Sequence, residues 1–199
     1  MKRSNWVGKK CIWVSLLCML LLLTACPVSQ TRKSVVVEPE YVMSTDTLPF
    51  SFFMPQEAIL QMAEIPQKEK VFVDLIFPQE KARLYCTYYA ITPERFRVMA
   101  EESRKLVYFH SAKADAIHED FYEDPGKGVY GIFYTLDGKV ATPFQLSLTD
   151  SATYYFHASL YFDSGESRPE KVDTLKILAK DLKQLMETFK HHPVHSKSL

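Results

Sequence analysis

The most specific chemistry in this sequence belongs to Cys26, which closes the motif Leu23-Thr24-Ala25-Cys26. Small residues directly before a cysteine are typical of a bacterial lipobox, in which the thiol is acylated and the chain is cut after Ala25. Residues 1–10 carry four basic side chains and no acid, and the apolar run over residues 11–23 is shorter than the ~20 residues of a membrane-spanning helix. We therefore predict a signal peptide cleaved between Ala25 and Cys26, and a palmitate-bearing Cys26 that anchors the chain to a lipid bilayer. The alternative is an ordinary signal peptide that leaves Cys26 as a free thiol.

Residues 110–120 contain side chains of the types that bind metal ions. The closest set of ligand types is a run of histidines and acids: His110, Asp115, His118, Glu119 and Asp120. The two histidines are eight residues apart, whereas metal-binding helices place histidines at i and i+4 on one face. Solvated polar residues are therefore favoured over a metal site, and no metal or cofactor is predicted.

Nucleophilic catalysis has two weak candidates. Cys86 lies in an expected strand with no histidine nearby in the sequence, which favours a buried, unreactive thiol over a nucleophile. His157 follows Phe156 in another expected strand and is predicted to be an outward-facing surface residue rather than a general base. No catalytic residue is predicted.

Aromatic residues suggest an interaction surface instead. Tyrosines alternate onto both faces of the expected strands, so some of them lie on a face that helices do not cover or that a partner covers. Exposed tyrosine is typical of protein interfaces. We predict such an interface from Tyr130, Tyr134, Tyr155 and Tyr161.

Charge and cysteine content narrow the class of protein. The chain has 24 basic and 24 acidic residues, and removal of the signal peptide with its four basic residues leaves 20 basic against 24 acidic. A mildly acidic chain with interspersed charges argues against nucleic-acid binding. Cys11 and Cys18 leave with the signal and Cys26 carries lipid, so the remaining Cys86 has no partner for an internal disulfide.

Strands account for most of the expected regular structure. Alternating or apolar runs bounded by turns predict strands over residues 71–77, 83–91, 116–122, 129–136, 140–148 and 154–162. Asp137-Gly138 predicts a tight hairpin turn, since both positions accept positive φ. Over 140–148 we expect half-solvated alternation, with Gln145, Ser147 and Thr149 facing outward.

Two amphipathic helices complete the expected set. Thr92-Pro93-Glu94 is a helix start, and an apolar stripe continues to about residue 112. The second helix starts at residues 167–169, and its stripe ends at Phe189.

The order of these elements predicts an α+β fold, an antiparallel sheet made of a hairpin and a meander and packed by two helices. This layout resembles the PsbP-like group of envelope domains. We predict a signal peptide over 1–25, a lipidated tether over 26–48, one α+β globular domain over 49–190 and a frayed tail over 191–199.

Beyond these patterns, the sequence resembles the GldD gliding-motility lipoprotein family of the Bacteroidetes. The resemblance covers the lipobox and residues 71–189. Its motifs are Leu106-Val107 in the first helix, the Lys113-Ala114 turn, Val129-Tyr130-Gly131 with Tyr134, residues 145–151, residues 159–162, and the ending from Asp181 to Phe189.

The resemblance implies an envelope lipoprotein needed for gliding and type IX protein secretion, with envelope proteins as partners and no known enzymatic activity. Residues 27–30 contain no acidic cluster of the kind that sends lipoproteins of this phylum to the cell surface, which favours a periplasm-facing domain. Two other hypotheses remain: a periplasmic lipoprotein that binds a small ligand or lipid in an aromatic pocket, and a metal hydrolase around His110 and His118.

Overall fold

The computed structural model describes residues 39–45, 47–63, 69–110, 113–164 and 172–192, without the side chain of His110. The chain divides into two compact units, 1–38 and 39–199, and the first lies outside the described residues. The predicted signal peptide, Cys26 and the start of the predicted tether fall in that first unit. All of the described residues belong to the second unit.

The second unit contains two helices and eleven strands among its described residues. The helices are α2 (Pro93–His110) and α3 (Val172–Thr188). The strands are β1 (Tyr41–Met43), β2 (Phe50–Ser51), β3 (Phe53–Pro55), β4 (Ile59–Met62), β5 (Lys70–Phe77), β6 (Ala82–Ala90), β7 (Ala114–Asp124), β8 (Val129–Gly138), β9 (Phe144–Thr149), β10 (Tyr154–Phe162) and β11 (Lys190–His191).

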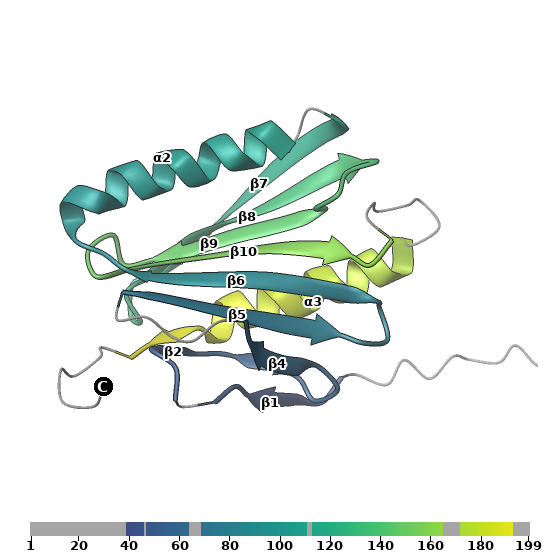
Figure 1. The fold of residues 1–199 in the computed structure, drawn as a ribbon, viewed down its shortest axis with the longest axis horizontal. Helices are drawn as coiled ribbons and strands as arrows, with labels where there is room; N and C mark the ends of the chain where they lie inside the picture. Colours follow the sequence, from purple (N-terminus) through teal and green to yellow (C-terminus); the bar gives the residue numbers. More distant parts are fainter. Residues whose placement is uncertain (1–38, 46, 64–68, 111–112, 165–171, 193–199) are drawn as a thin grey trace, which may run out of the picture. The chain divides into compact units, whose positions relative to one another are not determined.

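Seven of these strands form one antiparallel sheet in the order β4-β5-β6-β10-β9-β8-β7. The hairpin β5–β6 joins the meander through β10, where Ala158 lies opposite Cys86 of β6 on one side and Leu146 of β9 on the other. The predicted α+β class, with a hairpin, a meander and two helices, is confirmed (Figure 1).

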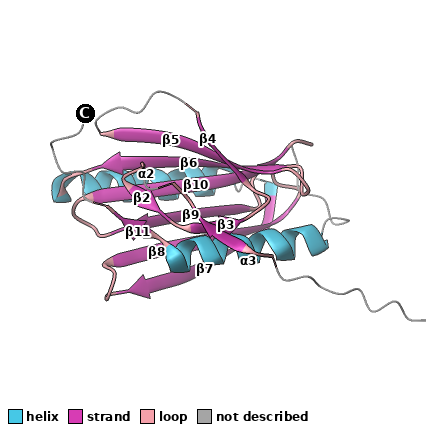
Figure 2. Cartoon of the chain, turned by 90° about the horizontal axis from the view of Figure 1, so that it is seen from below, coloured by secondary structure: helices cyan, strands magenta, loops and turns pink. Residues whose placement is uncertain are grey.

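The two helices lie on opposite faces of the sheet (Figure 2). The α3 face holds the larger core, in which Leu178, Leu182 and Phe189 pack against inward side chains of β5, β6, β9 and β10. The α2 face holds a smaller cluster around Val107. No described helix is both long enough and apolar enough to span a membrane.

The folded unit includes described residues beyond the predicted boundaries, namely 39–45 before residue 49 and 191–192 after residue 190, whereas residues 193–199 of the predicted tail lie outside the described residues. Residues 41–43 form β1, paired with β3, and the Tyr41 hydroxyl donates a hydrogen bond to Asp181 of α3 at 2.7 Å. At the other end, β11 pairs with β2, and the ring centroids of His191 and Tyr154 lie 4.5 Å apart. Both ends therefore belong to the folded unit, because aromatic contacts and pairing with residues far along the chain hold them.

The predicted tight turn at Asp137-Gly138 is also wrong. β8 continues through Gly138, which pairs with Ala114 of β7, and the connection to β9 runs over residues 139–143. Gly138 has a φ of 102°, but Asp137 is not among the described residues with positive φ. A two-residue turn of the expected kind needs positive φ at both positions.

β9 differs from its predicted half-solvated pattern. All six of its residues are buried, including Gln145, Ser147 and Thr149, which we expected to face outward. β9 lies between β10 and β8, with α3 on one face of the sheet and α2 on the other. Its polar side chains are buried for that reason.

Candidate functional site

The four tyrosines of the predicted interface all project from the α2 face of the sheet. Tyr130 and Tyr155 both lie opposite Thr149, on either side of β9. Tyr134 lies opposite Gln145 of the same strand, and Tyr161 lies opposite Arg83 of β6. The alternation of the strands thus places them on one face, away from the Phe156 and Leu160 side chains of the large core.

Two of the four are not exposed. Tyr134 is 3% and Tyr155 is 4% exposed, because α2 crosses this part of the sheet. Burial raises the pKa of Tyr134 to about 12 and also raises the pKa of Tyr155. Their prediction as surface contacts needs correction, and Tyr130 and Tyr161 remain as interface candidates.

An open part of the same face lies over β6 and the end of β10. There the Tyr85 and Tyr161 rings meet edge to face with their centroids 5.6 Å apart, and Tyr85 is 48% exposed. Together with Arg83, Phe162 and Asp163 they line a shallow hollow of about 400 Å³. We call Arg83, Tyr85 and Tyr161 the open aromatic face.

Arg83 is held in place at this face. Its Nη1 donates to Asp74 Oδ2 at 2.7 Å, and its guanidinium lies 5.8 Å from the Tyr85 ring centroid. The hydrogen bond to Asp74 is the main cause that raises the pKa of the Arg83 guanidinium. An aromatic pair beside a positioned arginine suits protein contact, because interfaces are enriched in tyrosine and arginine.

Tyr85 was missing from the predicted interface, although the alternation of its strand places it on the same face as Thr87 and Tyr89. Farther along this face the Lys70 ammonium lies 4.3 Å from the Phe72 ring centroid and 5.1 Å from that of Tyr89. Aromatic rings beside cations therefore recur on β5 and β6.

Most of the chain matches one known protein family. Residues 27–191 match the family model described as gliding motility lipoprotein GldD. The chain belongs to this family. No curated protein matches the chain. A solved structure, cyanobacterial PsbP (CyanoP) from Synechocystis sp. PCC 6803, is similar at 14% identity and a TM-score of 0.48, covering 79% of this chain and 96% of that one. At that TM-score the similarity supports no inference about function.

Membership in the GldD family confirms the predicted resemblance. It makes the chain a gliding-motility lipoprotein by family and so indicates membrane anchoring in the cell envelope. The predicted cleavage between Ala25 and Cys26 lies outside the described residues.

In this GldD family member the described side chains of the candidate metal set do not converge, and the side chain of His110 lies outside the described part of the chain. His118 Nε2 lies 3.0 Å from Asp137 Oδ2, and the Asp120 carboxylate pairs with Lys183 at 3.1 Å. Glu119 projects from the opposite face of β7, where the Tyr108 hydroxyl donates to it at 2.9 Å. Among the described residues no group of three or more histidines, cysteines or acids is placed to hold a metal.

The two nucleophile candidates lie inside the GldD-family fold. Cys86 is 2% exposed, and burial raises the pKa of its thiol far above the usual range. His157 is half-buried under α2 rather than on the surface as predicted, with Nδ1 3.2 Å from Ser103 Oγ and Nε2 3.1 Å from Ser159 Oγ. Both positions favour structural roles.

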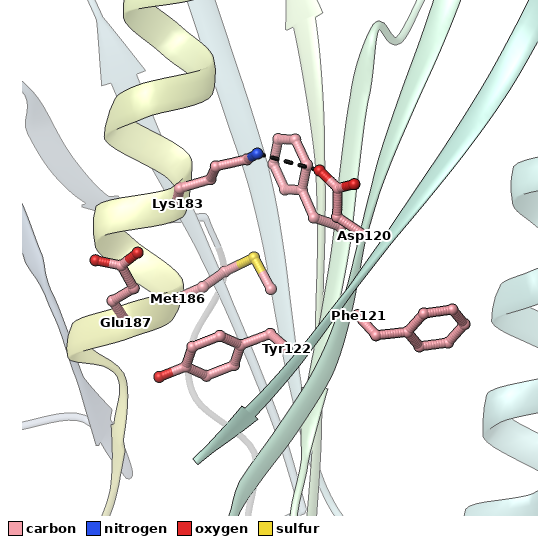
Figure 3. A pocket seen from close by; sticks show the side chains of 7 residues that line it. Asp120, Phe121, Tyr122, Lys183, Met186 and Glu187 are labelled. Carbon is pink, nitrogen blue, oxygen red and sulfur yellow. Dashed lines mark hydrogen bonds and ion pairs between the residues drawn. The ribbon is translucent and has the colours of Figure 1, made fainter.

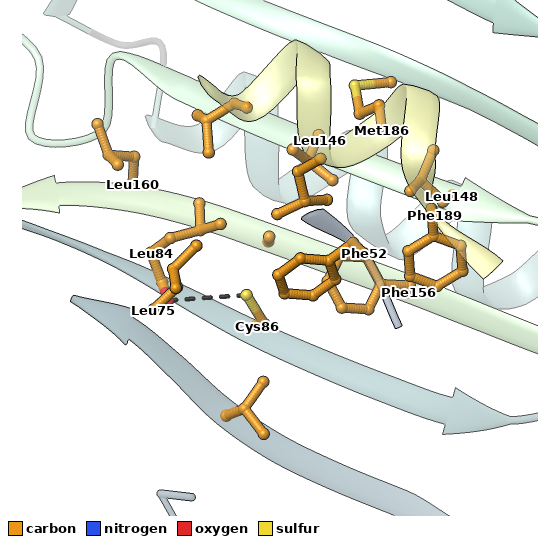
Figure 4. Packing of buried hydrophobic residues seen from close by; sticks show 14 of the residues in the cluster. Phe52, Leu75, Leu84, Cys86, Leu146, Leu148, Phe156, Leu160, Met186 and Phe189 are labelled. Carbon is orange, nitrogen blue, oxygen red and sulfur yellow. Dashed lines mark hydrogen bonds between the residues drawn. The ribbon is translucent and has the colours of Figure 1, made fainter. Parts of the chain in front are cut away.

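A ligand or lipid carrier would need a cavity beside the core. Between β7 and α3 the described residues line a hollow of about 130 Å³ (Figure 3), and near β3 another of about 160 Å³. Small-molecule sites commonly measure about 300–1,000 Å³, which both of these hollows fall short of. The hollow of about 400 Å³ at the open aromatic face reaches that size, but it is a shallow surface hollow and not a cavity beside the core. Phe52, Phe156 and Phe189 pack beneath α3 (Figure 4), with the last two rings 5.0 Å apart. These features favour a packed core over a carrier.

Proposed function

We propose that this GldD family member is a non-enzymatic accessory lipoprotein that supports gliding motility, type IX protein secretion or both through contacts with other envelope proteins. The acylated Cys26 is its anchor, and the unit from Pro39 onward faces the periplasm. The family match over residues 27–191 carries the proposal, and the matched stretch begins directly after Cys26. The absence of acids among residues 27–30 supports the periplasmic orientation.

The open aromatic face supports the protein-contact part of the proposal. Tyr85 and Tyr161 present aromatic surface beside the guanidinium of Arg83, which Asp74 orients. Residues of these types contribute most of the binding energy in many interfaces. No catalytic step is required of the protein, because its proposed action is to bind and position partners at the membrane.

Deletion of the gene in the native host tests this function. We expect reduced colony spreading, reduced release of type IX cargo into the medium, or both, with recovery when the wild-type gene is restored at its own locus. Unchanged spreading together with unchanged cargo release in the deletion strain would reject the proposal.

A further inference from the structure

β7 is an exposed edge of the main sheet. It is outermost after β8 and is 11 residues long, whereas β4 at the opposite edge has four residues. No described strand pairs with the outer side of β7 (Figure 2). An edge strand of this length presents a row of unpaired backbone N–H and C=O groups to any extended chain beside it.

The edge is strongly acidic. The strand Ala114–Asp124 contains five acids and no lysine or arginine: Asp115, Glu119, Asp120, Glu123 and Asp124. Two of them form ion pairs, Asp120 with Lys183 at 3.1 Å and Asp124 with Lys127 at 2.7 Å, whereas Glu119 accepts a hydrogen bond from the neutral Tyr108 hydroxyl at 2.9 Å. A surplus of negative charge remains along the strand, so its charge complement is a basic segment.

This charge also argues against a second copy of the chain as the occupant. Two β7 edges placed side by side would bring five acids of one copy next to five of the other. Like charges opposite one another destabilise strand pairing. The favoured occupant is therefore an extended segment of another protein that alternates basic and apolar residues.

Both faces of β7 offer contacts for the side chains of an added strand (Figure 3). On one face Phe121 is 73% exposed, with Glu119 and Glu123 two residues away on either side. On the other face, Tyr122 and Asp120 border the hollow of about 130 Å³ beside Met186. An added strand with period-two alternation would place its basic residues on the face of Glu119, Phe121 and Glu123, where their aliphatic stems can cover the Phe121 ring. Its apolar residues would then lie on the other face, beside Tyr122 and the hollow.

We propose that β7 binds an extended basic segment of a partner protein as an eighth strand of the sheet. Backbone hydrogen bonds supply the affinity, and the acids with Phe121 supply the preference for sequence. The inference shares with the proposed function only the need for a protein partner. Peptide binding at β7 can therefore succeed even if the deletion strain glides and secretes normally.

The test uses the full-length protein in detergent and a fluorescent peptide of about ten residues that alternates lysine and valine. Fluorescence anisotropy at about 50 mM salt should detect binding, and a glutamate–valine peptide should not bind. Two further peptides carry N-methyl groups at all odd or at all even positions. Alternate backbone N–H groups point to opposite edges of a strand, and only one edge of the added strand meets β7, so one of these peptides should lose binding and the other should keep it.

Charge reversal at the edge gives the second readout. E119K/E123K should weaken binding of the lysine–valine peptide by about tenfold, whereas the matched control E57K/E101K should change it by less than about twofold. Circular dichroism melts would show that both variants remain folded. The inference is overturned if no peptide binds, if both N-methylated peptides bind as well as the parent, or if the two double variants behave alike.

Discussion

Asp181 of α3 is a buried carboxyl that accepts a hydrogen bond from a tyrosine. It is 5% exposed, and Tyr41 donates a hydrogen bond to its Oδ1 at 2.7 Å. Burial raises the pKa of Asp181, and this effect outweighs the lowering by the Tyr41 hydrogen bond. A raised carboxyl pKa means that the folded state binds a proton more readily than the unfolded state. The ionised side chain therefore lowers stability at neutral pH.

We predict that Asp181→Asn raises the thermal midpoint at neutral pH, by about 2–4 °C if the gain is ~1 kcal/mol. The amide keeps an oxygen that accepts from Tyr41 and removes the buried charge. The advantage should shrink as pH falls, because the wild-type carboxyl becomes protonated. Melting curves from about pH 4 to pH 8 measure this, with Asp173→Asn at an exposed position of the same helix as the control. An equal or lower midpoint for Asp181→Asn at neutral pH would contradict the argument.

Cys26→Ala is predicted to abolish lipid labelling and to release the protein from membranes. The motif Leu23-Thr24-Ala25-Cys26 assigns the acylated thiol to this residue. Metabolic labelling with a palmitate analogue, followed by membrane fractionation, measures both effects. Cys86→Ala is the matched control and should keep its label, since Cys86 is buried in the folded unit. A labelled Cys26→Ala protein would disprove the assignment.

At single positions, the sequence predicts on which face of the sheet a side chain lies, but it does not predict which helix covers that face. The alternation of β8 and β10 puts the four predicted interface tyrosines on one face of the sheet, a grouping that follows from the strand pairing. It cannot show that α2 crosses over Tyr134 and Tyr155 and leaves Tyr85 open, because that depends on where the helix lies. The open aromatic face was therefore only partly predictable.

The helices differ in how fully their apolar stripes are used. On α3, Leu178, Leu182 and Leu185 are 0–1% exposed, as the strong stripe predicts. On α2, Val107 is buried but Leu106 is 52% exposed. The weaker pattern of α2 agrees with a helix that packs along a narrower strip.

Leu182→Ala should lower the free energy of unfolding by about 2–5 kcal/mol, because it leaves a cavity in the large core. Leu106→Ala on α2 should change it by less than about 0.5 kcal/mol, as expected of an exposed side chain. Chemical denaturation of both variants makes the comparison. Similar losses for the two would show that the packing assigned to α3 and α2 is wrong.

β8 and β9 approach each other closely at Gly131. A Cβ at this position would lie 2.4 Å from the Ser147 carbonyl oxygen and 2.5 Å from a Leu148 methyl carbon. Gly131→Ala should therefore cost about 1–3 kcal/mol in the free energy of unfolding, through forced movement of the backbone. Gly126→Ala is the control, since its Cβ would meet only the flexible Asp124 carboxylate at 3.3 Å. A stable Gly131→Ala protein would argue against this strand spacing.

Local patterns predicted both long helices and most of the long strands, but not the connections that depend on pairing. The alternating pattern over residues 140–148 suggested an immediate return strand after Gly138. In the structure the pairing of β8 with β7 extends to Gly138, and the return begins at Phe144. Pairing with β7 therefore overrides the turn preference of Asp-Gly.

Across the whole folded unit, contacts between distant residues close the structure. β10 joins the hairpin to the meander, and β11 near the end of the chain pairs with β2. The short strands β1, β2, β3 and β11 have two to three residues each, too few for a periodic pattern. Sequence patterns alone therefore assigned residues 39–48 and 191–192 to a tether and a tail.

At this scale the central claim is that a lipid-anchored domain supports gliding or secretion by binding a partner through its open aromatic face. Tyr85→Ala/Tyr161→Ala removes the aromatic pair. If the pair forms the centre of the interface, the free energy of partner binding should become less favourable by ~2 kcal/mol or more. Tyr85 is 48% exposed and Tyr161 is half-buried, so a circular dichroism melt of the double variant checks that the fold tolerates the change. Leu106→Ala, at a 52% exposed residue of α2, is the control.

The most direct measurement is complementation of the deletion strain with these genes, followed by colony spreading and quantification of type IX cargo in the medium. The wild type and Leu106→Ala should restore what the deletion loses, and Tyr85→Ala/Tyr161→Ala should not, although immunoblotting shows equal amounts in the membrane. Full restoration by Tyr85→Ala/Tyr161→Ala would contradict the account.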